Sequence, residues 1–113
     1  MAKHDPRLDL LFHALSDPTR RMMLNRLARG SAAVTELAGP TGLRLPTVLR
    51  HLSVLEAAGL IESQKDGRVR SCAFQPKALA PMRDWLEEQR AVWEARLDRL
   101  DGYVMKLMQE HKE

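Results

Sequence analysis

The stretch from Leu43 to Arg70 constrains the fold more than any other part of the chain. Pro46 fits the first position of a helix, where its missing N–H costs nothing, and Gly59 can adopt the left-handed conformation that closes a helix. A strand is expected after this helix, and Asp66-Gly67 is typical of a two-residue hairpin turn that needs a positive φ. This is the outline of a winged helix-turn-helix, so we expect a mainly α-helical fold with a small β-hairpin.

The expected helix has an apolar side and a polar side near its N-terminal half. Val48, Leu52 and Leu55 recur at helical spacing and would pack inward. Thr47, Arg50 and His51 would then face out, in the half that a recognition helix places in the major groove. An arginine fork matches guanine O6 and N7, a threonine can contact a base edge, and a histidine can donate to a base or a phosphate. The alternative is an ordinary solvated helix face.

The preceding segment supplies the first helix and the turn of the motif. Residues 34–38 form a short amphipathic piece, and Gly39-Pro40-Thr41-Gly42 interrupts it. Arg44 stands where a serine or threonine cap is expected, which leaves free amides at the start of the next helix. A base at this position indicates a phosphate contact, although an exposed arginine without a partner fits equally well.

The hairpin carries basic residues near its tip. Side chains alternate along a strand, so Arg68, Arg70 and Lys65 are expected to face one partner, with Val69 toward the core. Such a tip suits phosphates or the minor groove beside a recognition helix. Alternatively, these basic residues do not contact DNA and only protect the sheet edge from pairing with another chain.

The last third of the chain predicts a long helix with an apolar seam, from about Pro81 to Met108. Apolar residues recur there every seven positions, and residues 8–15 carry a second apolar stripe. Pairing of both stripes across a two-fold axis would bury them, whereas packing within one subunit is the alternative. The residues expected in the dimer interface are Leu8, Leu11, Leu86, Trp93, Leu97, Leu100 and Val104. Trp85 and Trp93 are expected as anchors of this interface or of the core, or as the lining of a pocket for an apolar effector.

Four motifs together resemble the ArsR/SmtB family of small dimeric winged-helix repressors. They are Leu-Ser-Asp-Pro-Thr-Arg at residues 15–20, Leu-Pro-Thr-Val-Leu-Arg-His-Leu at 45–52, Val-Leu-Glu-Ala-Ala-Gly-Leu-Ile at 54–61 and Gly-Arg-Val-Arg at 67–70. The resemblance implies a homodimer bound to an inverted repeat in a promoter. Metal-sensing members carry cysteines in the helix before the recognition helix or Asp and His pairs on the last helix. This chain has Val34–Ala38 in the first place and only His111, beyond Asp98 and Asp101, in the second, so no metal site is expected.

Composition is consistent with a DNA-binding body. Residues 1–76 hold eleven Lys and Arg against seven Asp and Glu, whereas residues 77–113 hold seven against eight, so the positive charge lies in the first part. The second helix carries four arginines, expected on phosphates or in salt bridges. No apolar run approaches the length of a membrane span, nothing resembles a signal peptide, and one cysteine cannot form an internal disulfide, so a cytoplasmic location is expected.

The sequence contains no spacing typical of a catalytic site or a cofactor loop, so neither an enzyme nor a cofactor is expected. We expect one domain over residues 1–113, with a dimerisation helix over 1–16, the DNA-binding body and wing over 17–76 and a second dimerisation helix over 77–113. Its predicted function is that of a homodimeric transcriptional regulator, specifically a repressor, on double-stranded DNA, with no effector identified. The alternative is a winged-helix module that binds another protein.

Overall fold

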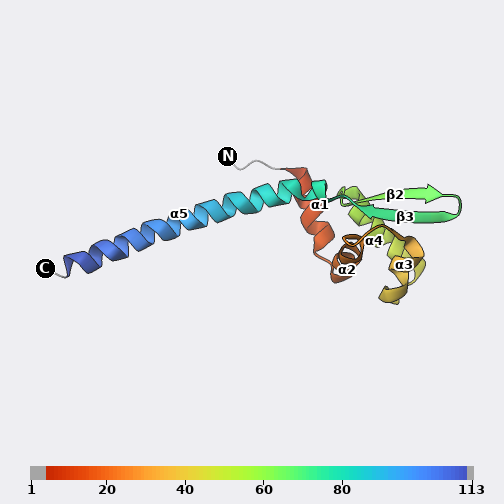
Figure 1. The fold of residues 1–113 in the computed structure, drawn as a ribbon, viewed down its shortest axis with the longest axis horizontal. Coiled ribbons are helices and arrows are strands. Elements are labelled where there is room, and N and C mark those ends of the chain that lie inside the picture. The colour runs from red at the N-terminus through yellow and green to blue at the C-terminus, as the bar shows by residue number, and fades with distance from the viewer. Residues whose placement is uncertain (1–4, 112–113) are drawn as a thin grey trace. The chain divides into compact units, whose positions relative to one another are not determined.

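The structure is a computed structural model that describes residues 5–111, in two compact units that divide between Pro81 and Met82. The first unit contains the helices and strands of the body, and the second consists of the greater part of one long helix (Figure 1). In chain order the elements are α1 (Pro6–Leu15), α2 (Pro18–Leu27), β1 (Ala32–Ala33), α3 (Val34–Ala38), η1 (Gly39–Thr41), α4 (Leu45–Ala57), β2 (Ile61–Asp66), β3 (Val69–Phe74), η2 (Pro76–Leu79) and α5 (Ala80–Glu110).

The corner between α1 and α2 is built by three consecutive residues. Ser16 ends α1, and its hydroxyl donates to the carbonyl of His13 at 2.7 Å. Asp17 caps α2 by accepting the backbone N–H of Arg20 at 3.1 Å, and Pro18 occupies the first helical position. A short polar cap followed by proline is the pattern that starts helices in general, which explains why α2 begins here.

The helix-turn-helix has the predicted order, with a 3₁₀ turn between its helices. Gly42 takes the left-handed conformation, with φ 67°, and α4 begins at Leu45, one residue before the predicted start at Pro46. At the other end, Gly59 has φ 76°, and the N–H of Leu60 bonds to the carbonyl of Leu55 at 3.0 Å. This pairing is a Schellman motif, so Gly59 closes α4 as predicted.

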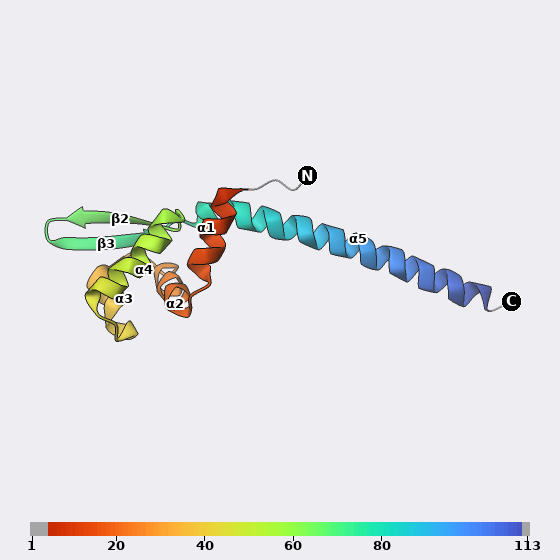
Figure 2. The ribbon, with the colours of Figure 1, turned by 180° about the vertical axis from the view of Figure 1, so that it is seen from behind.

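The wing is a β2–β3 hairpin (Figure 2), and the strand order of the sheet is β1-β3-β2. The two-residue strand β1 is an addition to the predicted hairpin. Asp66 pairs with Val69, so the central turn residues are Gly67 and Arg68, and the predicted Asp66-Gly67 turn is wrong by one residue. Only Gly67 of these two has a positive φ, at 63°, which is the conformation of a type II′ turn.

The core of the body joins α1, α2, α3 and α4 to the inner face of the sheet. Its members are apolar and nearly inaccessible to solvent: Leu11, Ala14, Met23, Leu24, Leu27, Ala32, Val34, Leu37, Val48, Leu52, Leu55, Leu60, Ile61 and Cys72. Leu11, predicted in the dimer interface, is 1% exposed and packs in this core instead. Because Leu11 is covered by its own subunit, its side chain is not available to a partner.

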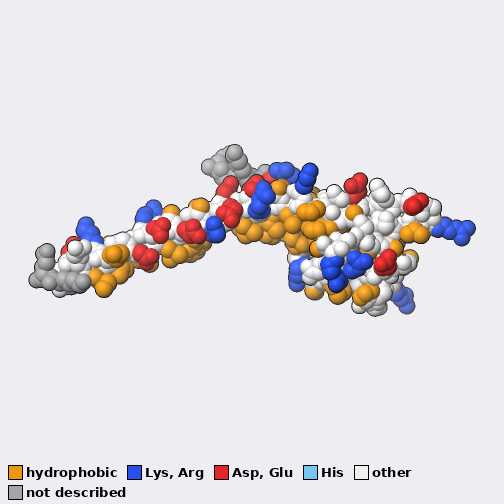
Figure 3. Space-filling view, in the orientation of Figure 1, with side chains coloured by type: hydrophobic (Ala, Val, Ile, Leu, Met, Phe, Trp, Pro, Cys, Tyr) orange, Lys and Arg blue, Asp and Glu red, His pale blue; other side chains and the backbone are white. Residues whose placement is uncertain are grey.

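The helix α5 is 31 residues long and contains no buried residue. Large apolar side chains nevertheless cover one side of it, from Leu86 to Leu107, and Figure 3 shows them as a band of orange along the helix. The predicted seam therefore exists as a continuous exposed surface. Among the residues that the structure describes, no helix combines the length and the apolar character needed to cross a bilayer.

Candidate nucleic-acid interface

The outer side of α4 carries the polar residues that were predicted to contact bases. Val48 and Leu52 are buried against the body, which turns Arg50 toward solvent. Arg50 makes no hydrogen bond or ion pair with any residue in the range 5–111, so its five N–H donors are open to a ligand. Thr47 lies one turn before it and is half-buried.

Arg44 occupies the N-cap position of α4, where its side chain forms no capping bond. It is exposed and, like Arg50, has no ion-pair partner in the described part of the chain. The positive end of the helix dipole and a guanidinium therefore meet at one place, an arrangement that favours a phosphate.

His51 does not stand free on the flank of α4. Its side chain is 17% exposed, and its Nδ1 lies 3.1 Å from Nη1 of Arg20 and 4.0 Å from the Asp17 carboxylate. The histidine predicted as a DNA contact is therefore also in contact with Arg20 of α2.

Arg20 is the only charged or polar residue among the described residues whose side chain is buried, at 8% exposure. Its Nε donates to the carbonyl of Ala14 at 2.7 Å, and its Nη2 donates to the carbonyl of His13 at 3.0 Å. Both carbonyls belong to the last turn of α1, where the helix dipole is negative, so the buried positive charge is compensated. One side chain thus connects α1, α2 and α4.

This role of Arg20 was not predicted from the sequence, where it was grouped with the other arginines of α2. Arg21 donates to the carbonyl of Leu15 at 2.7 Å, and Arg26 donates to that of Gly30 at 2.9 Å and lies 3.5 Å from Glu36, whereas Arg29 lies beyond the end of α2. The available signal was the position of Arg20, three residues after the Asp17 cap and on the buried face of α2.

The wing places its basic residues differently from the prediction. Val69 is 56% exposed, so its predicted orientation toward the core is wrong. Arg70 lies on the strand face that bears Cys72, opposite Lys65, and reaches Glu56 of α4 at 3.6 Å. Since Arg68 is a turn residue, it projects from the tip rather than from a strand face.

Lys65 and Arg68 are exposed and have no ion-pair partner in the described part of the chain. A groove of about 320 Å³ separates the wing from the start of α4, lined on one side by Leu45 and Leu49 and on the other by residues 68–70. The basic tip and the outer side of α4 therefore flank one depression.

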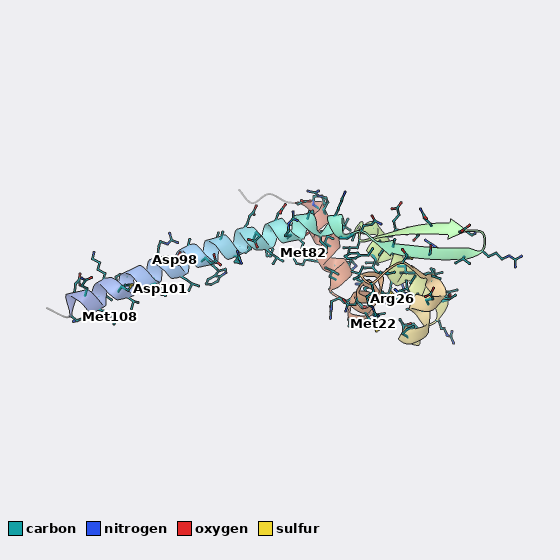
Figure 4. The ribbon with its side chains drawn as sticks, viewed as in Figure 1. Met22, Arg26, Met82, Asp98, Asp101 and Met108 are labelled. Atoms are coloured by element: carbon teal, nitrogen blue, oxygen red, sulfur yellow. The ribbon has the colours of Figure 1, made fainter. Side chains whose placement is uncertain are left out.

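No cluster of three or more metal-binding side chains occurs within residues 5–111. On α5, Asp98 and Asp101 lie three positions apart (Figure 4).

Cys72 is buried on β3, with Ser63 Oγ 3.8 Å from its sulfur. A buried thiol in apolar surroundings is structural in character.

Comparison with known proteins gives a consistent result. A model of a helix-turn-helix domain matches residues 15–64. The HTH-type transcriptional regulator Rv2034 of Mycobacterium tuberculosis is 39% identical over 79 residues, which cover 70% of this chain and 74% of that protein. The crystal structure of the ArsR family transcriptional regulator RHA00566 is 45% identical, with a TM-score of 0.75, and the match covers 78% of this chain and 97% of that one.

The fold also occurs in a solution structure from Mycobacterium bovis, the homodimeric winged helix-turn-helix DNA-binding domain Mb0332. It is 23% identical to this chain, with a TM-score of 0.61, over 80% of this chain and 91% of that one.

The capping of α2 predicts a pH dependence of stability. The pKa of Asp17 is lowered, chiefly because its carboxylate accepts the Arg20 N–H, while partial burial opposes the effect. A lowered folded-state pKa stabilises the fold above the unfolded value of about 3.9, and this contribution disappears as the pH falls through the folded value. Asp17→Asn keeps the capping oxygen but not the charge. Urea unfolding at fixed protein concentration should show the variant less stable at pH 7, with a difference that shrinks below about pH 4. A difference that stays constant with pH would contradict this assignment.

Proposed function

Since this chain belongs to the ArsR family of winged helix-turn-helix transcriptional regulators, we propose that it is a homodimeric repressor that binds an inverted-repeat operator in duplex DNA. The observation that carries the proposal is the outer side of α4. A buried apolar face fixes the helix, and Arg50 and Thr47 are presented beside each other without competing partners in the described chain. Arg50 would take guanine O6 and N7, and Thr47 a base edge or a thymine methyl group.

The wing would hold the DNA beside the bases that α4 contacts. Arg68 and Lys65 are exposed at or near the tip, and phosphate contacts from such residues set the register of a protein on the duplex. Arg70 shares its charge with Glu56, and this ion pair is half-exposed, so it adds little to stability and leaves Arg70 able to turn to a phosphate. Arg44 would contact a phosphate at the start of α4.

The apolar side of α5 supports the dimer. Leu86, Trp93, Leu97, Leu100 and Val104 are exposed along it, and a surface of this kind on a monomer marks a protein interface. Leu8 on α1 is half-buried and would join the same interface. A two-fold dimer would present two copies of α4, which matches an operator whose inverted half-sites lie about 34 Å apart, one DNA turn.

Repression follows from occupancy alone. A dimer on promoter DNA excludes polymerase from the same bases, whereas activation requires an additional contact with polymerase. A regulator of this kind acts in the compartment that holds its DNA, which we propose is the cytoplasm.

Selection of bound DNA from a random duplex pool tests the proposal directly. The recovered sequences should share an inverted repeat with half-site centres about ten base pairs apart, and affinity for it should fall steeply as salt rises. If the chain retains no duplex even at low salt, it is a module that binds another protein, and the proposal is wrong.

Two arginine variants separate base reading from phosphate contact. Arg50→Ala should cost about 1–3 kcal/mol on the selected operator and relax selectivity at one position of each half-site. Arg68→Ala should weaken binding to operator and scrambled duplexes alike and lower the salt slope by about 1 per subunit. Binding curves on both duplexes over a salt series provide the measurement. Equal losses on both duplexes for Arg50→Ala would make Arg50 a phosphate contact instead.

A pair of glutamate substitutions on α5 tests the dimer. Leu100→Glu places a charge in the apolar side of the helix and should shift the protein toward monomer in sedimentation, with DNA affinity falling at least tenfold, about 1.4 kcal/mol. Ala95→Glu lies on the opposite side of the same helix and should leave the dimer intact. If Leu100→Glu still sediments as a dimer at low concentration, α5 does not form the interface.

A further inference from the structure

The contact between Arg20 and His51 determines which ring nitrogen of the histidine carries a proton. Nη1 of Arg20 lies 3.1 Å from Nδ1 of His51. A guanidinium can only donate, so Nδ1 must accept, and the ring proton is then on Nε2. His51 is therefore a neutral imidazole whose free donor is Nε2–H.

Arg20 cannot easily move away from this role. Its guanidinium is buried and donates to two α1 carbonyls, at 2.7 Å and 3.0 Å, besides the histidine. The Asp17 carboxylate, 4.0 Å from Nδ1, accepts the backbone N–H of the same arginine. Loss of any one bond would leave a buried donor unsatisfied, which costs more than the bond itself contributes.

The opposite side of the ring is open. No residue in the range 5–111 forms a hydrogen bond with Nε2, and no buried side-chain nitrogen or oxygen in that range lacks a partner, so Nε2 is accessible to solvent. His51 follows Arg50 directly on α4 and therefore lies about 100° around the helix from it, on the side toward α2. When Arg50 enters the major groove, a side chain on this flank faces the groove wall, which consists of phosphates.

We propose that Arg20 is a positioning residue for DNA binding, which holds His51 so that its Nε2–H donates to an operator phosphate. The inference rests on the proposed function, because it requires that α4 binds DNA. It assigns to one buried arginine both a structural role, the connection of three helices, and a functional one, the selection of the histidine tautomer. The ligand of the histidine is a phosphate diester oxygen, and neither a metal ion nor a base edge.

Two isosteric substitutions separate the two ring nitrogens. In His51→Asn the amide occupies the place of Nδ1, so its oxygen can still accept from Arg20, but nothing replaces the Nε2 donor. In His51→Gln the amide reaches the place of Nε2 and supplies an N–H there, while the acceptor for Arg20 is lost. The His51→Asn variant should therefore keep the fold and lose the phosphate contact, whereas the His51→Gln variant should keep the contact at some cost in stability.

The experiment measures the affinity of each full-length protein for the selected operator over a salt series, together with the thermal unfolding of each variant. His51→Asn should bind about tenfold more weakly at every salt concentration, with an unchanged salt slope because a neutral donor releases no counterion, and His51→Gln should retain most of the wild-type affinity. Nitrogen-15 NMR of the unbound wild-type protein should show a protonated Nε2 and an unprotonated Nδ1.

Each alternative result is informative. A folded His51→Asn variant with wild-type affinity would overturn the inference while leaving the proposed function intact. A proton on Nδ1 in the wild-type ring would overturn it too, even if His51→Asn failed to fold. A wild-type protein without operator affinity would instead show that the proposed function fails.

Discussion

The buried guanidinium of Arg20 is the interaction on which the rest of the body depends. A charge in an apolar core must be compensated, and here the guanidinium donates to two carbonyls in the last turn of α1 and to His51 on α4, while Asp17 caps α2 at the backbone N–H of the same residue. Together these hydrogen bonds help to fix the arrangement of the three helices. The orientation of α4, and hence of everything it presents to DNA, follows from that arrangement.

Local patterns were sufficient to predict most elements of this fold. The proline start and glycine end of α4, the short α3 and the long α5 each have a signal confined to a few neighbouring residues. Strand β1 has no such signal, because Ala32-Ala33 is too short to alternate and exists only through its pairing with Cys72 and Ser71. The shift of the wing turn has a similar origin: both Asp66-Gly67 and Gly67-Arg68 suit a tight turn, and the pairing of the strands selects the second.

Residues of the candidate interface were predictable where exposure alone decides their role. Arg50 and Arg44 project from the body as their positions in and before α4 indicate. The positions that depend on contacts distant in sequence were not predictable: His51 and Arg20 are 31 residues apart, and Arg70 meets Glu56 across the gap between wing and helix. Leu11 illustrates the same limit, since an apolar stripe does not reveal whether it packs on its own subunit or on a partner.

The type II′ turn at the end of the wing also fixes how far Arg68 lies from α4. Arg68 belongs to the turn and not to a strand, so its side chain leaves the tip whatever the parity of the strands, and only the length of β2 and β3 sets its distance from α4. Each strand residue adds about 3.3 Å, close to the 3.4 Å rise of one base pair. In the proposed complex, adding or removing one cross-strand pair would therefore shift the Arg68 contact along the DNA by about one base pair relative to the contacts of α4.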